Sequence, residues 1–279
     1  MSACATSGRV LGIDVGYSAT RRTTGLCLLS WDEAVVDWRC ALAGSDEASR
    51  AAALERLLGG SKRIDAVAID GPLRPGLSVV ATYRAPECML SRGRFQRRGK
   101  PGPTNGGSGP RLHGAATELA RLCLARLHVR AAGSHPRVCD TAIVEAFPNL
   151  FLGVLCPEAE YPDAARVRRR WTDALIPRVR GRLGELLAAL LPGRRIAGDL
   201  ALRGHEAIAA WSCALTATCI AAGRFVAVGS EDDGFIVLPP LGFWGASASG
   251  AAAWASLELE RTLPGALRLF PRARRWVEG

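Results

Sequence analysis

Residues 10–14 read Val-Leu-Gly-Ile-Asp, an apolar run that ends in a carboxylate and is followed two residues later by Gly16. Residues 64–70 read Ile-Asp-Ala-Val-Ala-Ile-Asp and end in the same way, at Asp70, before a Gly-Pro turn. A short apolar run bounded by turn residues is typical of a strand buried in a sheet. We therefore predict two buried strands that each hold a carboxylate at the edge of a sheet.

A third run of this kind, Thr-Ala-Ile-Val over residues 141–144, ends in Glu145 and is soon followed by Pro148. Carboxylates that converge repel one another unless a cation lies between them. Hard oxygen ligands suit Mg²⁺ or Mn²⁺. The three strand ends therefore predict a divalent-cation site, and with it metal-dependent phosphoryl transfer.

The spacing of apolar and turn residues outward from these strands predicts the remaining elements. We expect strands over 9–15, 24–29, 34–40, 64–70 and 142–145, helices over 48–58, 112–129, 147–155 and 199–222, and short strands over 225–228 and 235–238. This order is that of the ribonuclease H-like fold, an α/β fold with a mixed five-stranded sheet and flanking helices. By analogy with that fold, the first and fourth strands are neighbours, and Asp14 faces Asp70.

The length of 279 residues and the hydrophobic fraction of 48% suit a single domain with a sizeable core. We place the core at about 9–240, with a Pro-, Gly- and Arg-rich loop over 71–110, a helical insertion over 158–198 and a C-terminal extension over 241–279. A leucine stripe in the insertion (Leu183, Leu187, Leu190) is expected to be core or dimer surface, and the apolar C-terminal half is compatible with a homodimer.

Charge and cysteine content limit the partners and the compartment. The net charge is +10, and 34 of the 36 basic residues are arginine, whose planar fork suits phosphate. The nine cysteines are scattered without a CxxC pair, so we expect reduced thiols in a cytoplasmic protein. The sequence has neither a signal-peptide pattern nor an apolar run long enough for a membrane span. We expect nucleic acid or another phosphate-bearing anion as the partner, and no membrane.

Two basic segments are candidates for binding that anion. The connection over 16–25 combines glycines, hydroxyls and two arginines, a composition that suits a phosphate cradle. The loop that follows Asp70 is expected to overhang the carboxylates and carries six basic residues between 84 and 100. The expected substrate-binding residues are Arg21, Arg22, Arg84, Arg92, Arg94, Arg97, Arg98 and Lys100.

Short motifs in a fixed order resemble an uncharacterised family, number 429 among the domains of unknown function, described as predicted nucleases of ribonuclease H-like fold. They are Gly12-Ile13-Asp14, Ile69-Asp70-Gly71-Pro72-Leu73, the Arg-Ala-Pro-Glu-Cys-Met-Leu of 84–90, Val144-Glu145-Ala146-Phe147-Pro148, the helix over 206–217 and the closing segment over 234–239. The resemblance covers roughly residues 9–240. It implies a nuclease that uses divalent metal.

The resemblance also implies a role for the late helix. With Glu206, the expected catalytic and metal-binding set becomes Asp14, Asp70, Glu145 and Glu206, and His205 could assist proton transfer. The family's helix often carries a second acid where this chain has Ala209. This chain has therefore lost a ligand, or Glu206 and His205 suffice.

Two other functions fit the same residues. Asp14-Val15-Gly16 resembles the phosphate hairpin of small phosphotransferases of the actin-like and sugar-kinase class, which bind ATP, although no second Asp-x-Gly hairpin follows residue 140. The loss of an acid at Ala209 instead favours a non-catalytic nucleic-acid-binding or partner-binding protein of the same fold.

Overall fold

A computed structural model describes residues 5–76, 82–97, 99, 101–129, 143–161, 171–197, 203–245 and 254–277. Its strands are β1 (Gly8–Asp14), β2 (Thr24–Trp31), β3 (Val35–Ala43), β4 (Arg63–Ile64), β5 (Ala66–Asp70), β6 (His128–Val129), β7 (Ile143–Ala146), β8 (Arg195–Ile196), β9 (Val226–Ser230), β10 (Gly234–Leu238) and β11 (Ala273–Val277). Its helices are α1 (Glu47–Leu58), α2 (Ala85–Leu90), α3 (Gly109–Arg126), α4 (Pro148–Leu155), α5 (Trp171–Leu190), α6 (His205–Ala221) and α7 (Trp254–Leu269), with short 3₁₀ turns η1 (Gly93–Arg97), η2 (Glu158–Glu160) and η3 (Leu241–Phe243).

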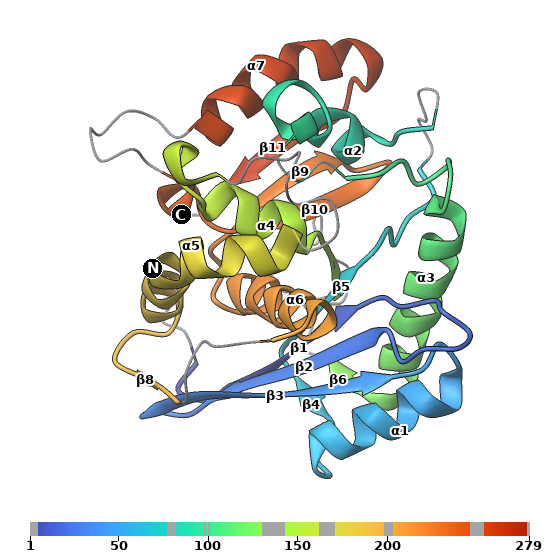
Figure 1. Ribbon diagram of the computed structural model, residues 1–279, viewed down its shortest axis with the longest axis vertical. Helices are drawn as coiled ribbons and strands as arrows, with labels where there is room; N and C mark the ends of the chain where they lie inside the picture. Colours follow the sequence, from blue (N-terminus) through green and yellow to red (C-terminus); the bar gives the residue numbers. More distant parts are fainter. Residues whose placement is uncertain are drawn as a thin grey trace.

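The chain forms an α/β molecule around one large mixed sheet with helices on both faces (Figure 1). The strand order is β11-β9-β10-β7-β5-β1-β2-β3-β8. β1, β2 and β3 form an antiparallel meander, whereas β5 and β7 continue parallel to β1. The register of β1 with β5 places Asp14 opposite Asp70, which confirms the expected adjacency of the two strands.

The sheet is larger than the five strands expected, because segments from the insertion and the extension join it. The insertion supplies β8, which pairs with β3, and the extension supplies β11, which pairs with β9. β9 and β10 extend the parallel half through β7. The leucine stripe of α5 is buried in the core beside α4 and α6. Of the two expected positions, core and dimer surface, the structure shows the core.

The segment over 71–110 is only partly a loop, contrary to the prediction. It contains α2 and η1, and α3 begins at Gly109 rather than near residue 112. α2 begins at Ala85, where the Glu87 carboxylate accepts the backbone N–H of Arg84 at 3.1 Å and Pro86 occupies the first turn. Its Met89 and Leu90, with Phe95 of η1, are buried in a cluster that α7 covers.

Two side-chain layers follow from the alternation of residues along the strands. One face of the sheet packs on α4, α5 and α6 through residues such as Val10, Ala68 and Val144. The other face packs on α1 and α3 through Leu11 and Ile69, and farther along on α2 and α7 through residues of β9 and β10. The face of the sheet on which a carboxylate lies therefore determines which other carboxylates it can contact.

Helix α6 lies unusually close to β1, because Gly12 has no side chain. A Cβ at Gly12 would overlap the backbone of Ala210 and Ala214, and neither backbone can move aside as a flexible side chain could. We expect Gly12→Ala to lower the free energy of unfolding by about 1–3 kcal/mol or more, as overpacking does in a well-packed core. Urea denaturation measures this, with Gly114→Ala as the control, because a Cβ at Gly114 of α3 meets nothing within 4 Å.

Candidate functional site

Asp14 and Asp70 form the centre of the candidate site, at the carboxyl ends of adjacent parallel strands. Asp14 is only 8% exposed, and the two carboxyl groups are close enough to share a hydrogen bond. Burial, and then the neighbouring charges of Asp70 and Glu206, raise the pKa of Asp14 well above its usual value. Burial also raises the pKa of Asp70 to about 7. In the absence of a cation the pair therefore retains a proton.

Glu206 approaches this pair from α6, as the sequence predicted. The carbonyl of Glu206 packs against Gly25 of β2, where a Cβ would overlap it, so α6 begins directly over the strands. The Glu206 side chain is half-buried, and its charge contributes to the raised pKa of Asp14. The structure thus pairs Asp14 with Asp70 and places Glu206 close enough for its charge to act on Asp14. Ala209, where an acid is missing, is buried farther along the same helix.

Cys213, two turns after Glu206 on α6, lies near the same pair and was not expected there. It is completely buried, and burial followed by the charges of Asp70 and Asp14 raises the pKa of its thiol well above the usual value. The thiol therefore remains protonated and does not supply a thiolate ligand. An isolated cysteine in an apolar helix gives no sequence signal of this position.

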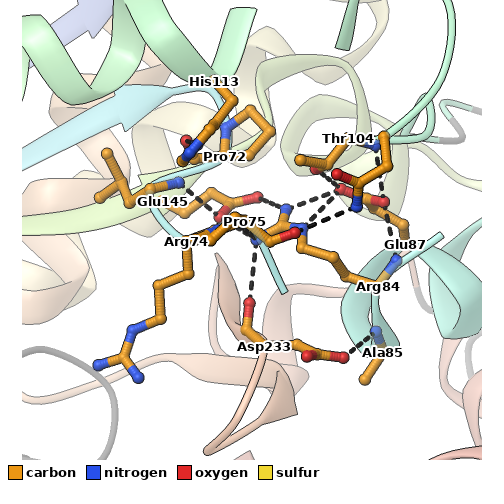
Figure 2. A network of polar contacts seen from close by, with 12 residues as sticks. Pro72, Arg74, Pro75, Arg84, Ala85, Glu87, Thr104, His113, Glu145 and Asp233 are labelled. Carbon is orange, nitrogen blue, oxygen red and sulfur yellow. Dashed lines mark hydrogen bonds and ion pairs between the residues drawn. The ribbon is translucent and has the colours of Figure 1, made fainter. Parts of the chain in front are cut away.

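Glu145, the fourth expected acid, is held by Arg84 (Figure 2). Arg84 Nη2 lies 2.7 Å from Glu145 Oε1, and Arg84 Nη1 donates to Glu145 Oε2 at 3.1 Å. Arg84 also pairs with Glu87, with Nη2 2.8 Å from Glu87 Oε1. Arg84 is fully buried, so it does not present its guanidinium on the surface as a substrate-binding residue would.

The other expected basic residues have different positions. Arg21 and Arg22 are exposed in the β1–β2 connection, which begins directly after Asp14. Arg92 and Arg94 are exposed near η1, which packs on α7, and Arg94 pairs with Glu158. Figure 1 places this part beside α7 at the top of the view, away from the end of β1. The Arg97 side chain, Arg98 and Lys100 lie outside the described residues.

His113 of α3 is a candidate that the sequence analysis missed. Its Nδ1 lies 2.8 Å from the carbonyl oxygen of Pro72, two residues after Asp70 (Figure 2). A carbonyl only accepts, so Nδ1 carries the hydrogen and Nε2 keeps a free electron pair in the neutral ring. His205, the expected proton carrier, begins α6 and is exposed. A histidine that follows Gly109-Pro110 in an amphipathic helix has no local signature of such a contact.

The acids meet the chemical requirement of a hard cation but do not form a complete cage. Within the parts of the chain that the structure describes, no group of three or more His, Cys, Asp or Glu side chains is already arranged around one point. The close approach of the Asp14 and Asp70 carboxyl groups is nevertheless an arrangement that loss of the shared proton would convert into a repelling pair of carboxylates. A divalent cation is the kind of ligand that would relieve this repulsion.

Comparison with known proteins adds no relative. No protein-family model matches the chain, and searches of curated proteins and of solved structures found no match. Among the described residues, no helix combines the length and the apolar character that crossing a bilayer requires. The function must therefore be inferred from the geometry of the site.

Proposed function

We propose that the chain is a ribonuclease H-like, metal-dependent phosphodiester hydrolase whose site is built on Asp14, Asp70 and Glu206. The observation that carries the proposal is the register of β1 and β5, which aligns two buried carboxylates under the start of a helix that carries a third. The meander of β1–β3 followed by parallel β5 and β7 supports the fold assignment. The resemblance of the motifs around these acids to a family of predicted nucleases supports the activity.

Each residue of the proposed site has its own role in binding the cation or the phosphate. Mg²⁺ or Mn²⁺ bound here would polarise a phosphoryl oxygen as a Lewis acid. Asp14 and Asp70 would hold the cation once their shared proton has left, and Glu206 would contribute a further carboxylate from α6. Arg21 and Arg22 lie in the connection that leaves this edge, and their exposed guanidinium groups hold the phosphate backbone.

His113 is the proton acceptor in this proposal: α3 packs on the face of the sheet opposite to α6, but the His113 ring is fixed at Pro72, beyond the end of β5, rather than beneath the sheet. Its hydrogen bond to Pro72 fixes the ring through Nδ1 and leaves Nε2 to accept a proton from the attacking water. The two aspartates remain the proposed ligands of the cation, and His113 accepts only the proton.

Hydrolysis of a generic phosphodiester tests the proposal. We expect bis-(p-nitrophenyl) phosphate, single-stranded DNA or RNA to be cleaved with Mn²⁺ or Mg²⁺, and cleavage to stop with chelator and in Asp70→Asn. Arg268→Gln, remote from the site on α7, is the matched surface control. Absence of cleavage of all substrates by metal-loaded protein contradicts the proposal, and turnover of ATP instead would indicate the phosphotransferase class.

His113→Asn separates proton transfer from structure. The Asn amide can still donate to the Pro72 carbonyl from the Nδ1 side, but it lacks Nε2. We expect a drop in kcat of about 10²–10⁴-fold, with the melting temperature and Mn²⁺ affinity close to wild type. An unchanged kcat would exclude His113 as the proton acceptor.

A further inference from the structure

Glu145 and the aspartate pair lie on opposite faces of the sheet. Along β7, Val144 and Ala146 face α6, so Glu145 points to the other side. Its neighbours in register, Ile69 and Ile236, also belong to that other face. Asp70 follows Ala68 by two residues on β5 and therefore faces α6. The alternation of the strands thus separates Glu145 from the other three acids, although its charge still reaches Asp70.

The guanidinium of Arg84 is fully used inside the protein. Nε donates to Glu87 at 2.9 Å, Nη2 contacts both carboxylates, and Nη1 is shared between Glu145 and the carbonyls of Arg74 and Asp233 at 3.2 and 3.0 Å (Figure 2). Glu87 is held in turn by Thr104, whose backbone N–H and hydroxyl both donate to it. Displacing Arg84 would therefore leave several buried groups unpaired.

Most of the acceptor capacity of Glu145 is also occupied. Oε1 accepts from Arg84 Nη2, and Oε2 accepts from Arg84 Nη1 and from the backbone N–H of Leu73 at 3.3 Å. An ionised carboxylate offers about four lone-pair positions, of which three are taken here. The arrangement differs from Asp14 and Asp70, whose carboxyl groups have only one another as a partner in the described residues.

The same pair holds the backbone that follows Asp70. Glu145 accepts from the N–H of Leu73, and Arg84 donates to the carbonyl of Arg74. His113 binds the carbonyl of Pro72 just before them. Three backbone polar groups, one on each of residues 72, 73 and 74, are thus fixed shortly after β5 ends at Asp70.

We propose that Glu145 is a positioning residue, which holds Arg84 and the 72–74 segment, and that the acidic site on the α6 face binds one divalent cation rather than two. This inference rests on the proposed function for the existence of the cation site. It departs from a two-metal arrangement with Glu145 among the ligands, because Arg84 already neutralises Glu145 from the opposite face.

The stoichiometry of Mn²⁺ binding to the wild-type chain tests this without any variant. We expect calorimetry of chelator-stripped protein to give one ion per chain, and electron paramagnetic resonance of the loaded protein to show isolated Mn²⁺. Two ions per chain with exchange-coupled spins, as expected for metals about 3.5–4 Å apart, would overturn the inference but leave the proposed cation site standing. No binding at all would overturn the proposed function itself, and the inference with it.

Glu145→Gln and Asp14→Asn are two carboxylate-to-amide variants for which we expect different effects on the melting temperature and on Mn²⁺ binding. In the metal-free protein, we expect Glu145→Gln to lower the melting temperature, because Arg84 loses one of its two carboxylate partners and keeps only Glu87. We expect Asp14→Asn to leave it equal or higher, because the amide can still donate to Asp70 and no second charge can form beside it. With Mn²⁺, Glu145→Gln should still bind one ion, whereas Asp14→Asn should lose binding. Loss of Mn²⁺ binding by a folded Glu145→Gln protein would contradict the positioning role.

Discussion

Arg84→Lys is expected to lower the free energy of unfolding by about 2–4 kcal/mol, because buried groups that the guanidinium now satisfies each cost about 1–3 kcal/mol when they are left unpaired. Lysine keeps the positive charge but cannot reproduce the two parallel contacts to Glu145 or the simultaneous contact with Glu87. Groups that Arg84 now satisfies, among them the carbonyl of Asp233, would lose their donor while buried. Urea denaturation with a tryptophan fluorescence readout measures the loss.

Arg126→Lys is the matched control for that variant. Arg126 pairs with Glu55 at 2.8 Å, but its side chain is 45% exposed, so we expect a change of less than about 1 kcal/mol. Arg84→Met should be worse than Arg84→Lys at neutral pH, because two carboxylates then remain without a cation. Equal, small effects at Arg84 and Arg126 would show that the network does not hold residues 72–74.

The metal-free protein is expected to lose stability as the pH rises from about 4 to about 8. The pKa of Asp70 is raised to about 7 in the folded chain, whereas an unfolded aspartate titrates near its ordinary value. Between these two values the folded state holds a proton that the unfolded state has released, so stability falls with rising pH. The loss should be on the order of 2–4 kcal/mol, since one pKa unit corresponds to about 1.4 kcal/mol.

The substitution Asp14→Asn and the binding of Mn²⁺ should each reduce this fall in stability with rising pH, for different reasons. The variant removes Asp14, whose own pKa is raised by burial and by the charge of Asp70, so one of the two titrating groups at the site is lost and its melting temperature should depend less on pH between 4 and 8. Saturating Mn²⁺ at pH 8 should restore the stability of the wild type by mass action and leave the variant unchanged. A wild-type profile that is flat, or that rises with pH over this range, would contradict the shared proton at the site.

The positions of Asp14 and Asp70 could be predicted because the signal is local. Each acid ends an uninterrupted apolar run, and one fold analogy then suffices to make the two strands neighbours. Glu206 followed from the same analogy. Pro86 and Glu87, both favoured in the first turn of a helix, are the local signal of α2 within the supposed loop.

The role of Glu145 could not be predicted, because it depends on pairings across the whole chain. Arg84 and Asp233 lie 61 and 88 residues from Glu145 in sequence, and only the order of β5, β7 and β10 brings them together. The strand β11 was missed for another reason: its Ala-Arg-Arg-Trp-Val sequence is polar, and the edge of the sheet at β9 decides its conformation.

Calorimetric titration of Mn²⁺ into chelator-stripped wild type and Asp14→Asn tests the central claim most directly. We expect one bound ion in the wild type, with release of the proton that Asp14 and Asp70 share, and no binding in the variant. Absence of binding to the wild type, or equal binding to both proteins, would contradict a cation site at the ends of β1 and β5.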